Sequence, residues 1–172
     1  PFWILTGKGS NQAIGRCRNK IIQPGDMVQI QIGARYEGYA STMGRAVVFG
    51  SATERQRQLI EAGLDAQREM LQMIRAGVNA GDVSRKHFEV MRRHGFESYI
   101  LYGPIHGTGL MEGEYPWIES TSDYLLEKNM TFCTCVYLGD DEQQIGMRME
   151  DGFLVTKRGT ESVADYPMRD IV

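Results

Sequence analysis

The order of hydrophobic patterns along the chain is the feature that most constrains its fold. In residues 27–32, apolar positions alternate with two glutamines, which is the period of a β-strand. Glu37-Gly38 supplies a turn, and the apolar residues 46–49 close the second strand before Gly50. Residues 27–49 are therefore predicted to form a β-hairpin.

Two helical patterns follow the hairpin. Ser51 precedes Glu54 by three residues, which is a capping-box signature, and apolar residues then repeat at helical spacing. The first helix is predicted to run from about Ser51 to Ala76. The second is predicted over residues 82–94, because Asp82 is a favourable N-cap and Gly95 a favourable residue to end on.

Strand patterns return after Gly95, in residues 100–102, 131–137 and 152–156. A hairpin, two helices and then further strands indicate an α+β fold with a mostly antiparallel sheet. With 172 residues and no repeat or linker, the chain is expected to form one domain.

The composition excludes several classes of protein. No apolar run approaches the roughly 20 residues of a transmembrane helix, and the first residues lack the basic start of a signal peptide. The chain begins with proline rather than methionine, so we expect it to start inside a longer sequence. The net charge is −3 and the basic residues are scattered, which argues against a nucleic-acid partner.

The chain has three cysteines, an odd number, and only one residue separates Cys133 from Cys135. Neighbours on one strand face rarely bridge each other, so reduced thiols and a cytoplasmic location are predicted.

Four segments together carry a family pattern: 22–28 (IQPGDMV), 38–45 (GYASTMGR), 106–110 (HGTGL) and 146–156 (GMRMEDGFLVT). In their order and spacing they resemble the pita-bread family of methionine aminopeptidase, Xaa-Pro aminopeptidase, prolidase and creatinase. The resemblance implies a curved, mostly antiparallel sheet with helices on its outer face. It also implies that residues 1–172 are a single pita-bread domain without its first helices or any N-terminal domain.

Family enzymes generally hold two divalent metals with two Asp, one His and two Glu, and the hydroxide between the metals attacks the amide. Carried over by resemblance, the two Asp positions fall on Gln31 and Thr42, and the first Glu position falls on Cys135. The histidine and the last glutamate are retained as His106 and Glu150. Gln31 and Thr42 are poor ligands for a dication. We therefore expect no dinuclear metal centre and no cofactor.

Two further family histidines position substrate or move protons, and by resemblance they fall on Ile14 and Gly113. Metal-free creatinases still use a histidine at the position of Ile14. The chain therefore departs from both the metal-dependent and the metal-free patterns.

The catalytic candidates are His106, Cys135 and Glu150. A thiolate beside an imidazole is a nucleophile–base pair, and Glu150 is placed to orient the ring. The same trio also suits one zinc ion through S, N and O ligands. The third interpretation is an inert buried cysteine beside a relic histidine in a glycine-rich turn.

Four other positions are candidates for substrate binding: Gln31, Thr42, Arg45 and Arg148. The two arginines flank the site in the family pattern and suit a substrate carboxylate. The alternative is a salt bridge to Glu150 or Asp151.

Four residues remain with less definite assignments. Glu112 and Glu114 are either a solvated loop pair or a substitute acid. His87 and His94 are interpreted as surface or helix-cap residues.

The resemblance implies a hydrolase-family protein that acts on a small amide or peptide-like molecule without a dinuclear metal centre. The alternative is a catalytically inactive domain that binds a ligand or peptide in the altered pocket. The expected partners are a small or peptide-like ligand and, as is common among relatives, a second copy of the chain in a homodimer. Nucleic acid and membranes are not expected partners.

Overall fold

The computed structural model of the chain describes residues 2–168. Its strands form one sheet in the order β1-β2-β3-β7-β6-β4-β5, and β8 pairs with β7 at one end. Every pairing among the described strands is antiparallel, in agreement with the predicted, mostly antiparallel sheet. The strands are β1 (Phe2–Thr6), β2 (Met27–Tyr36), β3 (Tyr39–Val48), β4 (Ile105–Gly107), β5 (Glu114–Ile118), β6 (Thr131–Asp140), β7 (Ile145–Val155) and β8 (Thr160–Ser162).

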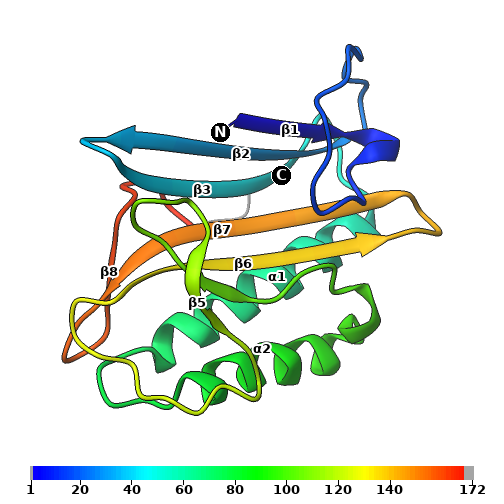
Figure 1. The fold of residues 1–172 in the computed structure, drawn as a ribbon. Helices are drawn as coiled ribbons and strands as arrows, with labels where there is room; N and C mark the ends of the chain where they lie inside the picture. The colour runs from blue at the N-terminus through cyan, green and yellow to red at the C-terminus, as the bar shows by residue number, and fades with distance from the viewer. Residues whose placement is uncertain (1, 169–172) are drawn as a thin grey trace.

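Two helices, α1 (Glu54–Met73) and α2 (Ala80–His94), lie on one side of the sheet, beside β6 and β7 (Figure 1). Gly63 brings α1 close to the strands, because a Cβ there would lie 2.2 Å from Cε of Met147. Met147 and Val136 are fully buried beneath the helix. This arrangement of helices on one face of an antiparallel sheet confirms the predicted fold class.

The opposite face of the sheet carries polar side chains. Gln29 and Gln31 alternate along β2 with residues that face the other way. On β7, Arg148 and Glu150 alternate in the same manner with Met147 and Met149. Period-two alternation thus separates an apolar core under the helices from a polar cluster on the other face.

The hairpin of β2 and β3 has the predicted boundaries, and Glu37 and Gly38 form its turn with positive φ angles of 48° and 90°. The predicted strand over residues 100–102 is wrong, since Ile100 makes only an isolated bridge to Leu138. Short 3-10 helices occupy Gly7–Gly9 and Glu97–Tyr99. Strands β1, β4, β5 and β8 are too short or too irregular to give a clear sequence pattern.

The start of α1 differs from the prediction. The N-cap is Thr53, and its side chain and that of Gln56 form a reciprocal capping box. Two capping boxes overlap in this sequence, and the one nearer the first helical turn is used. The helix also ends at Met73, earlier than predicted. In α2 the N-cap is Asn79 rather than Asp82, whereas Gly95 ends the helix in the left-handed conformation, as predicted.

We expect Thr53→Ala to lower the free energy of unfolding by about 1 kcal/mol, because it removes the side-chain acceptor at the helix start. Ser51→Ala is the matched control and should change stability by less than about 0.5 kcal/mol. Urea unfolding of the two variants measures the difference. A larger loss of stability in Ser51→Ala than in Thr53→Ala would show that the helix uses the capping box predicted from the sequence.

None of the described helices is both long and apolar enough to span a membrane.

Candidate functional site

Two neighbouring strands, β4 and β6, bring His106 and two cysteines together. His106 lies in β4, directly opposite Cys133 of β6. Cys135, two residues further along β6, lies directly opposite Glu150 of β7. His106 is therefore part of a buried strand and not of a glycine-rich turn, so that prediction is wrong.

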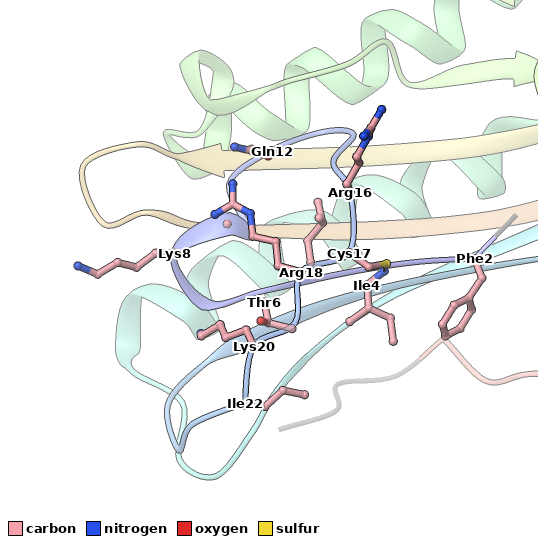
Figure 2. Close-up of a pocket in the computed structure, with 12 residues that line it drawn as sticks. Phe2, Ile4, Thr6, Lys8, Gln12, Arg16, Cys17, Arg18, Lys20 and Ile22 are labelled. Atoms are coloured by element: carbon pink, nitrogen blue, oxygen red, sulfur yellow. Dashed lines mark hydrogen bonds between the residues drawn. The ribbon is translucent and has the colours of Figure 1, made fainter.

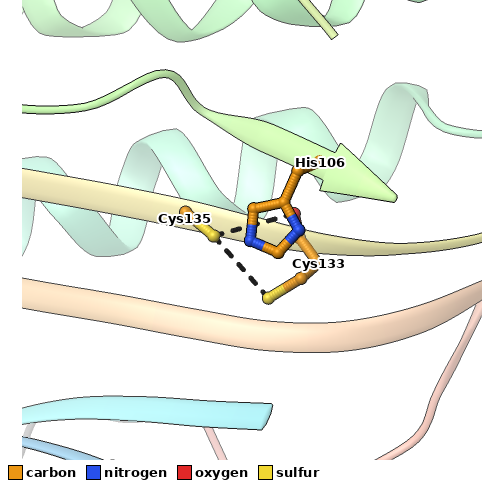
Figure 3. A group of neighbouring side chains, drawn as sticks. All are labelled: His106, Cys133 and Cys135. Carbon is orange, nitrogen blue, oxygen red and sulfur yellow. Dashed lines mark hydrogen bonds between the residues drawn. The ribbon is translucent and has the colours of Figure 1, made fainter. Parts of the chain in front are cut away.

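His106, Cys133 and Cys135 form a compact cluster (Figure 3). Their ligand atoms all lie within 4.8 Å of one another, and the two Sγ atoms are 3.7 Å apart. Both cysteines are fully buried and His106 is 4% exposed. Sequence reasoning missed Cys133, although its spacing of two from Cys135 on a strand places both thiols on the same face.

Burial and the contacts between neighbouring groups together set the pKa values of the cluster. Burial alone lowers the pKa of His106, but its contact with Cys135 and its hydrogen bond to Gly107 outweigh that effect and raise the pKa to about 9. Burial also raises the pKa of the Cys133 thiol well above its usual range, and the neighbouring Cys135 adds to that shift. A positive imidazolium is therefore favoured only beside a negative partner.

Glu150 is the centre of a separate hydrogen-bond network. Its Oε1 accepts from Nε2 of Gln31 at 2.9 Å and from the hydroxyl of Thr42. Its Oε2 accepts from the hydroxyl of Tyr137. Glu150 is fully buried, and these three donors satisfy it in place of positive charge. It does not hydrogen-bond to His106, whose Nδ1 lies 2.8 Å from the carbonyl oxygen of Gly107.

Arg148 closes this network from the side of the N-terminal segment. One guanidinium nitrogen donates to Oε1 of Gln31, and another donates to the carbonyl oxygen of Ala13. The guanidinium also lies 4.0 Å from the ring centroid of Tyr137. Arg148 is thus held by protein groups on three sides.

Arg45 points to the other face of the sheet. Its two terminal nitrogens contact Asp151 at 2.7 and 3.1 Å, and one also donates to the carbonyl oxygen of Glu150 at 2.9 Å. The side chains of Arg45 and Asp151 are 5% and 8% exposed. The sequence left open a substrate carboxylate or an internal salt bridge as the partner of Arg45, and the structure has the salt bridge to Asp151.

The remaining sequence candidates surround the network. Glu112 accepts from Nε2 of Gln31 at 2.9 Å, and burial raises its pKa. Glu114 instead accepts from the backbone of Met111 in the loop. Gly113 lies beside the His106 ring, whereas Ile14 lies near Gln31 and Arg148. Glu112 is therefore the acid that joins the site, and Glu114 is not.

The interpretation of His87 as a surface or cap residue is wrong. His87 lies on the inner face of α2 and is fully buried. Among the described residues, neither of its ring nitrogens has a hydrogen-bond partner. His94, in contrast, is partly exposed and contacts Asp65 at 3.1 Å.

A cavity of about 430 Å³ lies between β1 and the segment that follows it (Figure 2). Its lining includes Lys8, Arg16, Arg18 and Lys20, and Lys20 is paired with Asp26 at 2.6 Å. None of the residues of the His106 cluster or the Glu150 network lines it. The cavity is a positively charged concavity distinct from the site.

Comparison with known proteins tests the resemblance. Residues 1–157 match the sequence profile of Metallopeptidase family M24. The chain belongs to this family. Over 92% of its length it is 31% identical to a Xaa-Pro dipeptidase of Pyrococcus furiosus. It is similar in structure to a prolidase from Pyrococcus horikoshii, with a TM-score of 0.93 and 27% identity over 99% of the chain. A dipeptidase from Mycobacterium ulcerans is similar at a TM-score of 0.94 and 27% identity over 99% of the chain.

These M24 relatives confirm the pita-bread fold expected from the four motifs. The chain spans 45% of the Pyrococcus furiosus protein and 49% and 46% of the other two. It therefore corresponds to about half the length of each relative.

Proposed function

We propose that this M24 domain is a hydrolase for a small amide or peptide-like molecule and that it works without a dinuclear metal centre. The observation that carries the proposal is the proximity of the Cys135 thiol to the His106 ring at the position where the family motif places its metals. A thiolate beside an imidazole is a nucleophile–base pair. The M24 relatives named above support the hydrolase class.

The hydrogen bonds around Glu150 argue against a pair of hard divalent metals. Two dications need several carboxylates, whereas Gln31 and Thr42 direct hydrogen-bond donors at Glu150. Oε1 of Gln31 already accepts from Arg148. The side chains at this position therefore do not fit two metal ions, and no step of the proposed reaction uses a metal ion.

The proposed reaction begins with attack of the Cys135 sulfur on the amide carbonyl while His106 holds the thiol proton. His106 then gives this proton to the leaving amine as the carbon–nitrogen bond breaks, which leaves a thioester. Water hydrolyses the thioester and restores the thiol. The carbonyl of Gly107 orients the ring through Nδ1, the role that the sequence had suggested for Glu150.

Substrate contacts are proposed for Gln31, Thr42 and Arg148, which lie on the same face as the cluster. Arg148 is the candidate for a substrate carboxylate, because its present acceptors, Gln31 and the carbonyl of Ala13, are uncharged and a carboxylate can replace them. Arg45 is left out of this proposal, since Asp151 occupies its guanidinium on the opposite face.

The test uses proline-containing dipeptides and small amides as substrates. Any turnover should survive metal chelators, and Cys135→Ser or alkylation should lower kcat/KM by at least about a thousandfold, because the nucleophile is lost. Cys17→Ser is the matched control, since this exposed thiol lies outside the cluster. Turnover that is unchanged in Cys135→Ser would refute the nucleophile, and turnover that requires two metal ions would refute the proposal as a whole.

A second candidate is a catalytically inactive domain that binds a ligand or peptide. The burial of Gln31, Thr42 and Glu150 in a network that satisfies itself favours this candidate. Its signature is thermal stabilisation by a tested amide without any turnover. Loss of that stabilisation in Arg148→Gln would assign the ligand to the same site.

We also propose a cytoplasmic location and a homodimer. Two buried free thiols 3.7 Å apart are compatible with a reducing compartment. Light scattering on the purified chain measures the oligomeric state, and a monomer at micromolar concentration would contradict the dimer.

A further inference from the structure

We propose that Cys133, Cys135 and His106 form a binding site for one zinc ion, which overlaps the dinuclear site of the family at His106 and Cys135 and adds Cys133. The ligand atoms of the three side chains come from two adjacent strands and already converge within 4.8 Å of one another. Two of them are sulfur, and one of the cysteines, Cys133, lies outside the family ligand pattern described above.

The separation of the sulfurs fits a zinc ion. Two sulfurs bound to one tetrahedral zinc, each at about 2.3 Å, lie about 3.8 Å apart. The Sγ atoms of Cys133 and Cys135 are 3.7 Å apart. A disulfide would need them at about 2.05 Å. The two thiols contact each other directly, with Cys135 Sγ donating to Cys133 Sγ, and this spacing also suits two sulfurs that share one ion, whereas it is too long for a covalent bond.

The orientation of His106 fits as well. The carbonyl oxygen of Gly107, 2.8 Å from Nδ1, can only accept a hydrogen bond, so Nδ1 carries the proton. In the neutral ring this leaves the lone pair of Nε2 for the ion, which displaces any proton held there. A backbone carbonyl that fixes the tautomer of a ligating histidine is a common outer-shell feature of metal sites.

The chemistry of the donors selects zinc over the hard ions. Two thiolates balance the charge of one dication, and sulfur and imidazole prefer zinc to magnesium, calcium or manganese. Glu150 is no competitor for this ion, because Gln31, Thr42 and Tyr137 already donate to its oxygens. The zinc alternative suggested by the sequence thus gains a different third ligand, Cys133 in place of Glu150.

The site has a regulatory consequence, which rests on the proposed function. A zinc ion on Cys135 takes the thiolate away from the substrate, so zinc is expected to inhibit hydrolysis reversibly. Zinc binding itself does not depend on any activity, and it is measured without substrate.

The experiment starts with the reduced, metal-free chain. Titration with Zn²⁺ is followed by elemental analysis after desalting, and titration with Co²⁺ by thiolate-to-cobalt absorption. The expected result is one ion per chain, with two sulfur neighbours at about 2.3 Å in X-ray absorption of the zinc form. No bound zinc in the fully reduced protein would overturn the proposal, as would coordination by oxygen and nitrogen alone.

Variants separate this site from the one expected of the family. Cys133→Ser should weaken zinc binding by more than about a hundredfold, since loss of an outer-shell partner alone costs 10–100-fold. Cys17→Ser is the control and should bind like the wild type. Glu150→Gln should retain zinc, because Glu150 is not a ligand. Loss of binding in Glu150→Gln but not in Cys133→Ser would overturn the assignment. Circular dichroism establishes whether each variant is folded. If Cys133→Ser does not fold, His106→Gln gives a second test of the ligand set.

Discussion

Arg45→Ala is expected to lower the free energy of unfolding by about 3–5 kcal/mol, because it leaves Asp151 buried without its charge partner. Both terminal nitrogens of Arg45 contact this carboxylate, and the pair lies on the helix side of the sheet. Nε2 of Gln67 in α1 also contacts Asp151, at 3.2 Å. The salt bridge therefore joins β3, β7 and α1.

An exposed ion pair supplies the matched control. Arg85 and Asp82 contact each other at 2.6 Å on α2, but their side chains are 52% and 54% exposed. Arg85→Ala should cost no more than about 0.5 kcal/mol beyond its effect on helix propensity. Equal losses for the two variants in urea unfolding would contradict the role of burial.

Burial raises the pKa of Asp151 even though Arg45 opposes the shift. Without Arg45 that pKa should rise further, so the folded variant keeps a proton that the unfolded chain releases. Between the pKa of Asp151 in the unfolded chain and its higher pKa in the folded variant, the free energy of unfolding falls as the pH rises. The cost of Arg45→Ala should therefore be larger at pH 8 than at pH 5. A double variant that replaces both residues with apolar ones should recover most of the loss.

The sequence predicted the fold well because its strongest signals are local. The period-two pattern of residues 27–32 and the turn at Glu37-Gly38 fix the hairpin, and its register brings Gln31 near Thr42 without further information. The four family motifs then placed the remaining strands in the correct fold. The boundaries of the helices were less certain, because Ser51 and Thr53 offer competing caps to the same helix.

The partners of each site residue could not be predicted in the same way. The sequence offered Arg45 two partners, and only the path of β3 turns its side chain toward Asp151. Cys133 was not assigned to the site, because its place there depends on β4 pairing with β6, and β4 has only three residues. Glu150 was expected to orient His106, but it accepts hydrogen bonds from the hydroxyls of Thr42 and Tyr137 instead. Contacts of this kind depend on tertiary packing, which the periodicity of the sequence does not predict.

Because His87 is buried, it is expected to lower the free energy of unfolding by about 3 kcal/mol between neutral pH and pH 4. Burial lowers the pKa of His87 from 6.5 to about 4, because the charged ring has no compensating partner. Between these two values the unfolded chain binds a proton that the folded chain does not. The free energy of unfolding therefore falls as the pH drops through this window, and the full contribution returns above pH 6.5.

Other carboxyl groups also titrate in this range, so the prediction concerns a difference between two proteins. His87→Met replaces the ring with an apolar side chain of similar size and removes the titrating group. Neither ring nitrogen forms a hydrogen bond within the described chain, so at pH 8 the variant should be about as stable as the wild type. At pH 4 the variant should be more stable by about 3 kcal/mol. Urea unfolding at a series of pH values gives both curves, and parallel curves from pH 8 to pH 4 would show that His87 is solvated or paired in solution.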